Sequence, residues 1–284
     1  MTEQKRTDRT LSISHLEAFR AFLHREEKSP VTVEKYLRDV RGFLSFASGR
    51  PVDKELVLSY KSSLVEGGYA LRSVNSMLAS LNSLLGFLGW MECRVKSLKC
   101  QRQIYSPSDK ELTKAEYLRL VEAAKGKEQL QLVLKTICGT GIRVSELKFF
   151  TVEAVKKGEV TVHCKGKNRI ILVPGKLRRL LLDYAKRHGI KEGVLLQSRG
   201  GKPLDRSNIW ARMKGLCKAA QVNPAKVFPH NLRKLFARTF YELEKDIAKL
   251  ADILGHGCIE TTRIYIMTTG TEHRRKLERL GLVV

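Results

Sequence analysis

The sequence predicts a mainly α-helical protein that contains a small β-sheet and divides into two domains. Apolar residues recur at helical spacing through most of the 284-residue chain. Two runs rich in β-branched residues, 160–164 and 170–173, interrupt this pattern and are typical of strands. A basic linker without clear periodicity, residues 94–110, separates the two parts, and the chain is long enough for two ordinary domains.

The first domain is expected to be a compact set of four helices over residues 12–93. The preceding residues, 1–11, are mostly polar and are expected to be disordered. Turn-forming residues separate the four helical patterns, which begin near Ser12, after Pro30, at Asp53 and near Leu71. Short turns between amphipathic helices favour a domain in which the helices pack against one another.

The second domain is expected to span residues 111–284, with a tail from about residue 268. It opens with Thr113-Lys-Ala-Glu116, which has the form of a capping box at a helix start. The two β-branched runs predict a hairpin, with the basic segment Lys165–Asn168 at its tip. Further helices are expected up to about Ile137, over 176–187, 206–220, 231–244, 246–255 and 260–267, and over 272–280 in the tail.

The chain carries a formal net charge of +24, from 53 Lys and Arg against 29 Asp and Glu. Such an excess is unfavourable unless a polyanion neutralises it, and nucleic acid is the natural partner. Most of the excess follows residue 104, so the second domain should make more of the phosphate contacts. The six cysteines form no CxxC pair, and no apolar signal core or membrane-spanning run is visible. We therefore expect a cytoplasmic protein without membrane contact.

Three short segments carry residue types suited to phosphoryl chemistry. They are Gly139-Thr-Gly-Ile-Arg143-Val-Ser-Glu146-Leu147, Pro229-His230-Asn-Leu-Arg233, and Leu254-Gly-His256 followed by Thr261-Thr-Arg-Ile-Tyr265. Each segment alone has an ordinary structural interpretation, such as a surface arginine, a packed His–Arg pair or a helix stop. Their order and spacing along one chain make the combination informative.

This combination resembles the tyrosine recombinase family, also called phage integrases, and in particular its compact Xer-like members. The resemblance covers the whole chain. It implies a helical core-binding, SAM-like DNA-binding domain followed by a mixed α/β tyrosine recombinase catalytic domain. It also implies a catalytic set that consists, in chain order, of Arg143, Lys165, His230, Arg233, His256 and Tyr265.

The chemistry of these side chains fits such a role. Two guanidiniums can hold the nonbridging oxygens of a phosphodiester and offset charge that grows in the transition state. A phenol can attack phosphorus, and the resemblance implies a 3′-phosphotyrosine bond to Tyr265 with a free 5′-hydroxyl. Lys165 could protonate the departing alkoxide, and the histidines could transfer protons or donate hydrogen bonds. Glu146 could orient a basic residue. The scheme needs no metal, ATP or other cofactor.

Several assignments stay open at this level. Lys167 lies on the same face of an extended hairpin as Lys165 and competes with it as the general acid, although Lys165 fits the family pattern better. Tyr241 is the alternative nucleophile. Lys234 stands where many relatives have a second histidine, and we expect it to contact DNA together with Lys167 and Arg169.

The resemblance implies duplex DNA with inverted-repeat half-sites as the substrate. It also implies a homotetramer on DNA, formed from protomers that are monomeric when free. Integration and excision of a mobile element is the favoured outcome, with Xer-type dimer resolution and DNA inversion as alternatives. A type IB topoisomerase-like enzyme and a non-catalytic DNA-binding relative are the competing functions. The apolar end of the tail, Leu280–Val284, would pack on its own domain or on a neighbouring protomer.

Overall fold

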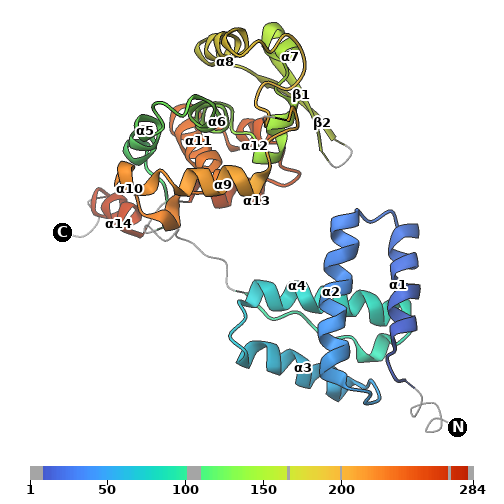
Figure 1. Ribbon diagram of the computed structural model, residues 1–284. Helices are drawn as coiled ribbons and strands as arrows, with labels where there is room; N and C mark the ends of the chain where they lie inside the picture. Colours follow the sequence, from blue (N-terminus) through green and yellow to red (C-terminus); the bar gives the residue numbers. More distant parts are fainter. Residues whose placement is uncertain (1–8, 101–109, 165–166, 199, 268–269, 281–284) are drawn as a thin grey trace, which may run out of the picture. The chain divides into compact units, whose positions relative to one another are not determined.

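The computed structural model describes residues 9–100, 110–164, 167–198, 200–267 and 270–280. The chain divides into two units, Met1–Arg102 and Gln103–Val284 (Figure 1). In the described residues most of the chain is helical and two strands form one small sheet, which confirms the predicted mainly helical class. None of the described helices is both long and apolar enough to cross a membrane.

The first unit contains the four helices that the sequence predicted. They are α1 (Ile13–Arg25), α2 (Pro30–Ala47), α3 (Lys54–Glu66) and α4 (Leu71–Phe87), followed by a short 3-10 turn, η1 (Met91–Cys93). Ser29 caps α2 by accepting a hydrogen bond from the backbone N of Thr32. Asp53 caps α3 in the same way. Apolar side chains from all four helices form the core, including Phe19, Leu37, Phe43, Tyr60, Leu78 and Leu85.

The packed part of this unit includes residues before the first predicted helix. The backbone N of Val52 donates a hydrogen bond to Arg9 O, and Leu11 is buried in the core. The sequence indicated disorder up to residue 11 because the segment is short and mostly polar. Contact with the turn before α3 instead holds residues 9–11 in place.

The chain after η1 is irregular but stays attached to α4. Asn82 exchanges two hydrogen bonds with the backbone of Val95, and Asn75 does the same with Leu98. These bonds hold the first residues of the expected linker against the first unit. The later part of that linker lies outside the described residues.

The second unit is larger and contains most of the elements. In chain order they are α5 (Lys114–Ala123), α6 (Glu128–Thr140), η3 (Val144–Phe149), α7 (Val152–Lys157), β1 (Glu159–Cys164), β2 (Lys167–Leu172), α8 (Gly175–Arg187), α9 (Arg206–Lys214), α10 (Cys217–Ala220), η4 (Pro224–Lys226), α11 (Pro229–Glu244), α12 (Ile247–Leu254), α13 (Ile259–Ile266) and α14 (Gly270–Glu278). The predicted capping box is present, since Thr113 and Glu116 each accept a hydrogen bond from the other's backbone N.

Some elements differ from the sequence prediction. The short helix α7 was not predicted, and the helix expected over 206–220 is interrupted at Gly215, giving α9 and α10. Glycine is a weak helix former, which accounts for the break. The helix expected in the tail is present as α14, with Leu277 exposed. The apolar end of the tail, 281–284, lies outside the described residues, so its docking stays a prediction.

The two strands form an antiparallel hairpin with a tight connection. The register joins Cys164 to Lys167, so residues 165–166 alone connect the strands. The four-residue tip that the sequence predicted is therefore shorter. Asn168 belongs to the ladder because it pairs with His163, whose Nδ1 lies 2.6 Å from Asn168 Oδ1.

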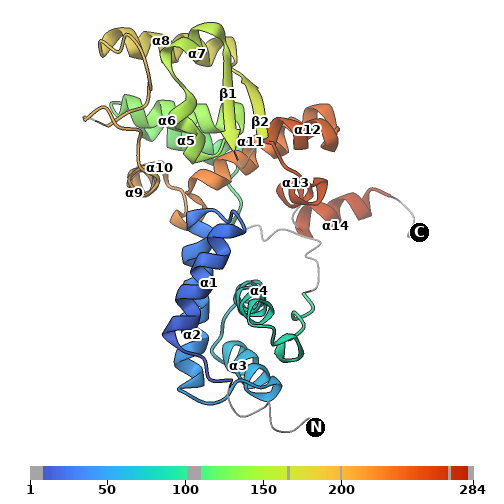
Figure 2. The same ribbon diagram turned by 90° about the vertical axis from the view of Figure 1, so that its right-hand side faces the viewer.

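The arrangement of helices places the three motifs in one region. α6 packs against α11, and α12 and α13 pack against other parts of α11, while the hairpin lies beside α12 (Figures 1 and 2). A small apolar cluster of Ala237, Leu250, Leu254 and Tyr265 joins α11, α12 and α13. The end of α6, the start of α11 and the end of α12 carry the motif residues.

Candidate active site

The chain turns sharply where the first motif begins. α6 ends at Thr140, and Gly141 adopts a left-handed backbone with φ of +66°. A Cβ atom at this position would lie 2.3 Å from Phe236 Cδ1, so glycine is required there. The turn brings Arg143 to the start of η3, where its side chain is 35% exposed.

Glu146 holds Arg143 in place. Its Oε2 accepts a hydrogen bond from the backbone N of Arg143 at 2.7 Å, and its Oε1 accepts one from Arg143 Nη1 at 3.0 Å. Arg143 Nη2 also donates to Gly255 O at 3.4 Å. Glu146 is buried. These contacts suit the orienting role that the sequence suggested for it.

Arg233 on α11 is almost completely buried, with 1% of its surface exposed. Its Nη1 donates to Gly141 O at 2.6 Å and its Nη2 donates to Leu254 O at 2.7 Å, while Nε has no partner in the described residues. Burial, and then the charge of Arg143, lower the pKa of Arg233 to about 10, so the group is still charged at neutral pH. A buried cation is costly unless an anion neutralises it, which suits a phosphate site.

His256 follows α12 and bonds to Arg233. Arg233 Nη2 lies 3.0 Å from His256 Nε2, and because a guanidinium can only donate, Nε2 accepts. The proton of the neutral ring is therefore on Nδ1, which donates to Thr262 Oγ1 at 2.9 Å. Burial, followed by the charges of Arg233 and Arg143, lowers the pKa of His256 to about 4. Arg233 thus fixes one tautomer of the neutral histidine, and the buried Thr262 accepts the remaining ring N–H.

Tyr265 on α13 lies against both histidines. Its ring centroid is 4.9 Å from that of His256 and 5.0 Å from that of His230, and Arg233 Cζ lies 5.9 Å from the ring. The Tyr265 side chain is buried. Tyr241, the alternative nucleophile, packs beside the same small apolar cluster, with Lys245 Nζ 5.8 Å from its ring centroid.

His230 stands at the start of α11, and part of its ring faces solvent. Burial of the remainder of the ring, followed by the charge of Lys234 and then those of Arg233, Arg143 and Arg206, lowers the pKa of His230 to about 4. The ring is therefore neutral at pH 7 and can accept a proton or a hydrogen bond.

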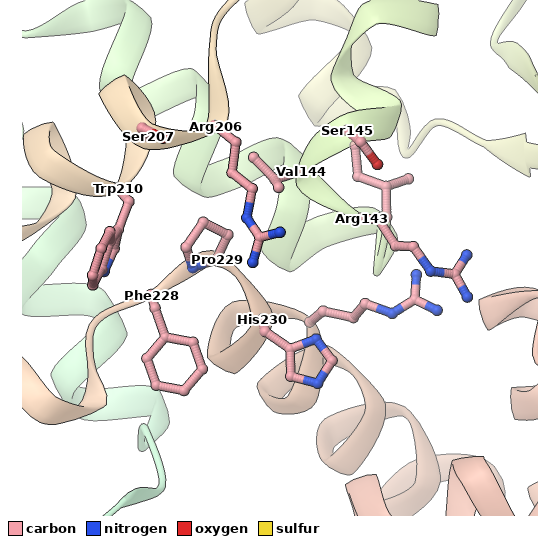
Figure 3. Close-up of a pocket in the computed structure, with 11 residues that line it drawn as sticks. Arg143, Val144, Ser145, Arg206, Ser207, Trp210, Phe228, Pro229 and His230 are labelled. Carbon is pink, nitrogen blue, oxygen red and sulfur yellow. The ribbon is translucent and has the colours of Figure 1, made fainter. Parts of the chain in front are cut away.

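A pocket of about 610 Å³ opens beside these residues (Figure 3). Arg143 and His230 lie on one side of it, and Trp210 and Phe228 lie on another. The side chain of Arg206, from the start of α9, points into the middle of the pocket (Figure 3). The described residues provide no hydrogen bond or ion pair for Arg206. The pocket therefore offers an unengaged cation next to the motif arginines.

The residues that α9 contributes to this pocket were not predicted from the sequence. Arg206 and Trp210 lie outside the three motifs, and α9 itself lacks a strong apolar stripe. The available signal was their spacing, because residues four apart share one face of a helix. Trp210 is also 49% exposed, which is unusual for a large aromatic side chain outside an interaction site.

The remaining predicted site residues lie in different settings. Lys165 is outside the described residues, and so is the side chain of Lys167 at the start of β2. Lys234 on α11 is partly buried, and burial lowers its pKa. Arg169, which was expected to contact DNA, points into the protein with its side chain 13% exposed and pairs with Glu146.

Comparison with known proteins gives the family. Residues 110–271 match the model of the phage integrase family, and residues 16–92 match that of the phage integrase N-terminal SAM-like domain. The chain is 29% identical to tyrosine recombinase XerA of Pyrococcus furiosus over 97% of each protein. It is 27% identical to tyrosine recombinase XerD of Halalkalibacterium halodurans, over 86% of this chain and 89% of that protein.

Solved structures share the fold. A crystal structure of XerA recombinase matches 95% of this chain and 99% of its own, with a TM-score of 0.54 and 24% identity. A lambda integrase tetramer bound to a Holliday junction matches 92% of this chain and 79% of its own, with a TM-score of 0.74 and 17% identity. XerH recombinase bound to its difH substrate matches 94% and 84%, with a TM-score of 0.69 and 20% identity.

The phage integrase model covers more than half of the chain, so this protein belongs to the phage integrase family. It is a site-specific DNA recombinase of the tyrosine class. The resemblance inferred from the three motifs is confirmed, as is the combination of a SAM-like first domain with a recombinase catalytic domain.

Proposed function

We propose that Tyr265 is the nucleophile of this recombinase. Its phenolic oxygen attacks the scissile phosphorus and the bond from phosphorus to the 5′ oxygen breaks, which leaves a 3′-phosphotyrosine and a free 5′-hydroxyl. The new bond keeps the energy of the phosphodiester, so a 5′-hydroxyl from another strand can reverse the step without ATP. The observation that carries this proposal is the packing of the Tyr265 ring against His230, His256 and Arg233.

The two arginines of the motifs would hold the phosphate. Arg143 is partly exposed at the pocket and held by Glu146, while Arg233 is held by hydrogen bonds to two backbone carbonyls. Because these cations are already oriented, they can stabilise transition-state charge with little reorganisation. His256 is neutral and bonded to Arg233, so we assign it a hydrogen-bonding role, and the more exposed His230 can exchange a proton with the nucleophile.

Lys165 is the general acid in this proposal, and Lys167 is the alternative. Both belong to the turn end of the β1–β2 hairpin. An ammonium group there can give a proton to the 5′ oxygen as it leaves phosphorus. The pairing of Arg169 with Glu146 supports this assignment, because it ties the hairpin to the motif that contains Arg143.

The substrate would be duplex DNA with inverted-repeat half-sites, bound by a homotetramer whose protomers are monomeric when free. The net charge of +24 and the unengaged Arg206 in the pocket support binding of the DNA backbone. Lys167 and Lys234 would bind further phosphates. Two structural relatives, lambda integrase on a Holliday junction and XerH on difH, were solved with DNA. We place the reaction in the cytoplasm.

We favour integration and excision of a mobile element as the biological outcome. Xer-type dimer resolution and DNA inversion are the alternatives, and several relatives carry Xer names. Sequencing the DNA fragments that the protein binds in its native host would distinguish the three. Sites at the ends of a mobile element support the first outcome, whereas a single chromosomal site supports dimer resolution.

The nucleophile can be tested with nicked target DNA and denaturing electrophoresis in the presence of EDTA. Wild type and the matched control Tyr241→Phe should both give a covalent protein–DNA band. Tyr265→Phe should bind DNA but give no band, since the change removes the hydroxyl and keeps the ring. A band from Tyr265→Phe would contradict the assignment. Loss of wild-type cleavage in EDTA, restored by magnesium, would indicate two-metal chemistry instead.

A further inference from the structure

Arg169 on β2 occupies the inward face of the hairpin. In the register it pairs with Val162, which is buried, and two positions along the strand Ile171 is buried as well. Ile170, between them, is exposed, as alternation along a strand requires. A guanidinium therefore stands where the hairpin faces the interior, and burial of that charge is costly unless it is paired.

Glu146 provides the pairing. Arg169 Nη1 donates to Glu146 Oε1 at 3.1 Å and Arg169 Nη2 donates to Oε2 at 2.7 Å, so two parallel bonds join the groups. The same carboxylate accepts bonds from the side chain and the backbone N of Arg143. Glu146 therefore links the hairpin to the turn that carries Arg143.

The backbone of Gly255 lies against the side chain of Arg169. A Cβ atom at Gly255 would lie 2.6 Å from Arg169 Nη1 and 2.8 Å from Arg169 Cδ, so the side chain lies directly on the backbone that precedes His256. Gly255 O in turn accepts a hydrogen bond from Arg143 Nη2. Arg169 thus contacts both Glu146, which holds Arg143, and Gly255, which precedes His256.

We propose that Arg169 is a positioning residue for the general acid. By anchoring β2 to Glu146 and Gly255, it fixes the hairpin so that the lysine in its turn reaches the leaving 5′ oxygen. This inference rests on the proposed function, in which that lysine is Lys165. Lys165 directly follows Cys164, the last residue of β1, in the chain, so displacement of the strands would displace the lysine.

The test compares two substrates for each variant. One is normal nicked DNA, and the other carries a sulfur in place of the bridging 5′ oxygen at the scissile phosphate. A thiolate leaves without protonation, so the second substrate does not need a general acid. The measured quantity is the rate of covalent adduct formation on each substrate. The ratio of the two rates does not depend on how much of a variant is folded, because both rates scale with the active fraction.

Arg169→Ala should slow cleavage of normal DNA by about 100-fold, the loss that a displacement of about 1 Å can cause. On the sulfur substrate its rate should approach that of wild type. Arg169→Lys keeps the charge but cannot form two parallel bonds, so it should show the same pattern with a smaller loss. Arg178→Ala is the matched control, since Arg178 is an exposed arginine of the same unit that donates to the backbone O of Lys156. Its ratio should equal the wild-type ratio.

Lys165→Ala and Lys167→Ala serve as references for loss of the acid itself. If one of them is rescued by sulfur and Arg169→Ala is not, the positioning role is wrong, and Arg169 acts on phosphate binding through Glu146 and Arg143. If neither lysine variant is rescued, the proposed general acid is wrong and the inference that rests on it also fails. Rescue of Arg169→Ala together with one lysine variant supports both.

Discussion

Buried charge serves different purposes in the two units of this recombinase. In the first unit, Asp39 is a buried carboxylate that accepts a hydrogen bond from Ser80 Oγ at 2.9 Å and pairs with Lys35 Nζ at 2.8 Å. These groups lie on α2 and α4 and join two neighbouring helices. In the second unit, the buried Glu146 and Arg233 come from different motifs. Arg233 lines the pocket, and Glu146 pairs with Arg143, which lines the same pocket.

The two arrangements also differ in how completely the charges are satisfied. Lys35 and Asp39 neutralise each other locally, one turn apart on the same helix. In the second unit, Arg233 and Arg169 each have a buried Nε without a partner in the described residues. Burial, and then repulsion from Arg143, lower the pKa of Arg233. Polar groups without hydrogen-bond partners and charges without counter-charges are expected at functional sites. Here they suggest that a phosphate completes the second arrangement, whereas the first is complete in itself.

Arg233→Lys should have the largest effect of the changes that test this comparison. An ammonium keeps the charge, but it cannot bond both backbone carbonyls and His256 while facing the phosphate. We expect the rate of covalent adduct formation to fall by about 10² to 10³, with DNA affinity nearly unchanged. Single-turnover cleavage and gel-shift titration measure the two quantities. A loss of cleavage below tenfold would place Arg233 outside the phosphate site.

Thr262→Val should have a smaller effect on the same reaction. The change keeps the shape of the side chain but removes the acceptor for His256 Nδ1, so this ring N–H loses its partner and the ring keeps only its bond to Arg233. We expect cleavage to slow by about tenfold, since an unmade buried hydrogen bond costs about 1–3 kcal/mol. Thr262→Ser should restore the rate. Failure of serine to do so would indicate that packing, and not the hydrogen bond, is what matters.

The two site histidines predict a dependence of stability on pH. Burial lowers their pKa to about 4, from 6.5 in an unfolded chain. Between these values the unfolded chain binds more protons, so the free energy of unfolding of the second unit falls as pH decreases from about 6.5 to about 4. Above pH 6.5 these two histidines do not change the free energy of unfolding further. In urea titrations at pH 5 and pH 7, His256→Gln should show a smaller drop than wild type, and an equal drop would contradict the assignment.

Asp39→Asn should have the smallest effect on catalysis. It leaves Lys35 without its carboxylate and weakens the contact with Ser80, so the first unit should lose about 2 kcal/mol of stability. With saturating DNA, adduct formation should change less than twofold. A large drop in the cleavage rate, with stability unchanged, would contradict the purely structural role of Asp39.

The convergence of the motifs could be predicted from the sequence. The order and spacing of Arg143, His230, Arg233, His256 and Tyr265 pointed to one site, and the structure brings these side chains together. The helices of the first unit could also be predicted, because their apolar stripes are strong. Such signals are local or follow a fixed order along the chain, so they survive without knowledge of the packing.

The orientation of Arg169 could not be predicted. Residues 170–172 are all apolar, so alternation does not reveal which face of β2 points inward. The structure buries Ile171 and exposes Ile170 and Leu172, and this choice turns Arg169 toward Glu146. Packing against residues distant in the sequence determines which face of β2 is buried. In the same way, contact with Phe236 determines the need for glycine at position 141.

The most direct test of the account is to locate the covalent bond itself. The adduct formed on nicked target DNA would be treated with nuclease and trypsin, and the modified peptide identified by mass spectrometry. Cleavage after Arg263 and Arg274 gives a peptide in which Tyr265 is the sole tyrosine. We predict that the added phosphate mass lies on Tyr265, that the joined DNA end is a blocked 3′ end, and that the released end is a free 5′-hydroxyl. A modified peptide that contains Tyr241, or a DNA strand joined through its 5′ end, would contradict the central claim.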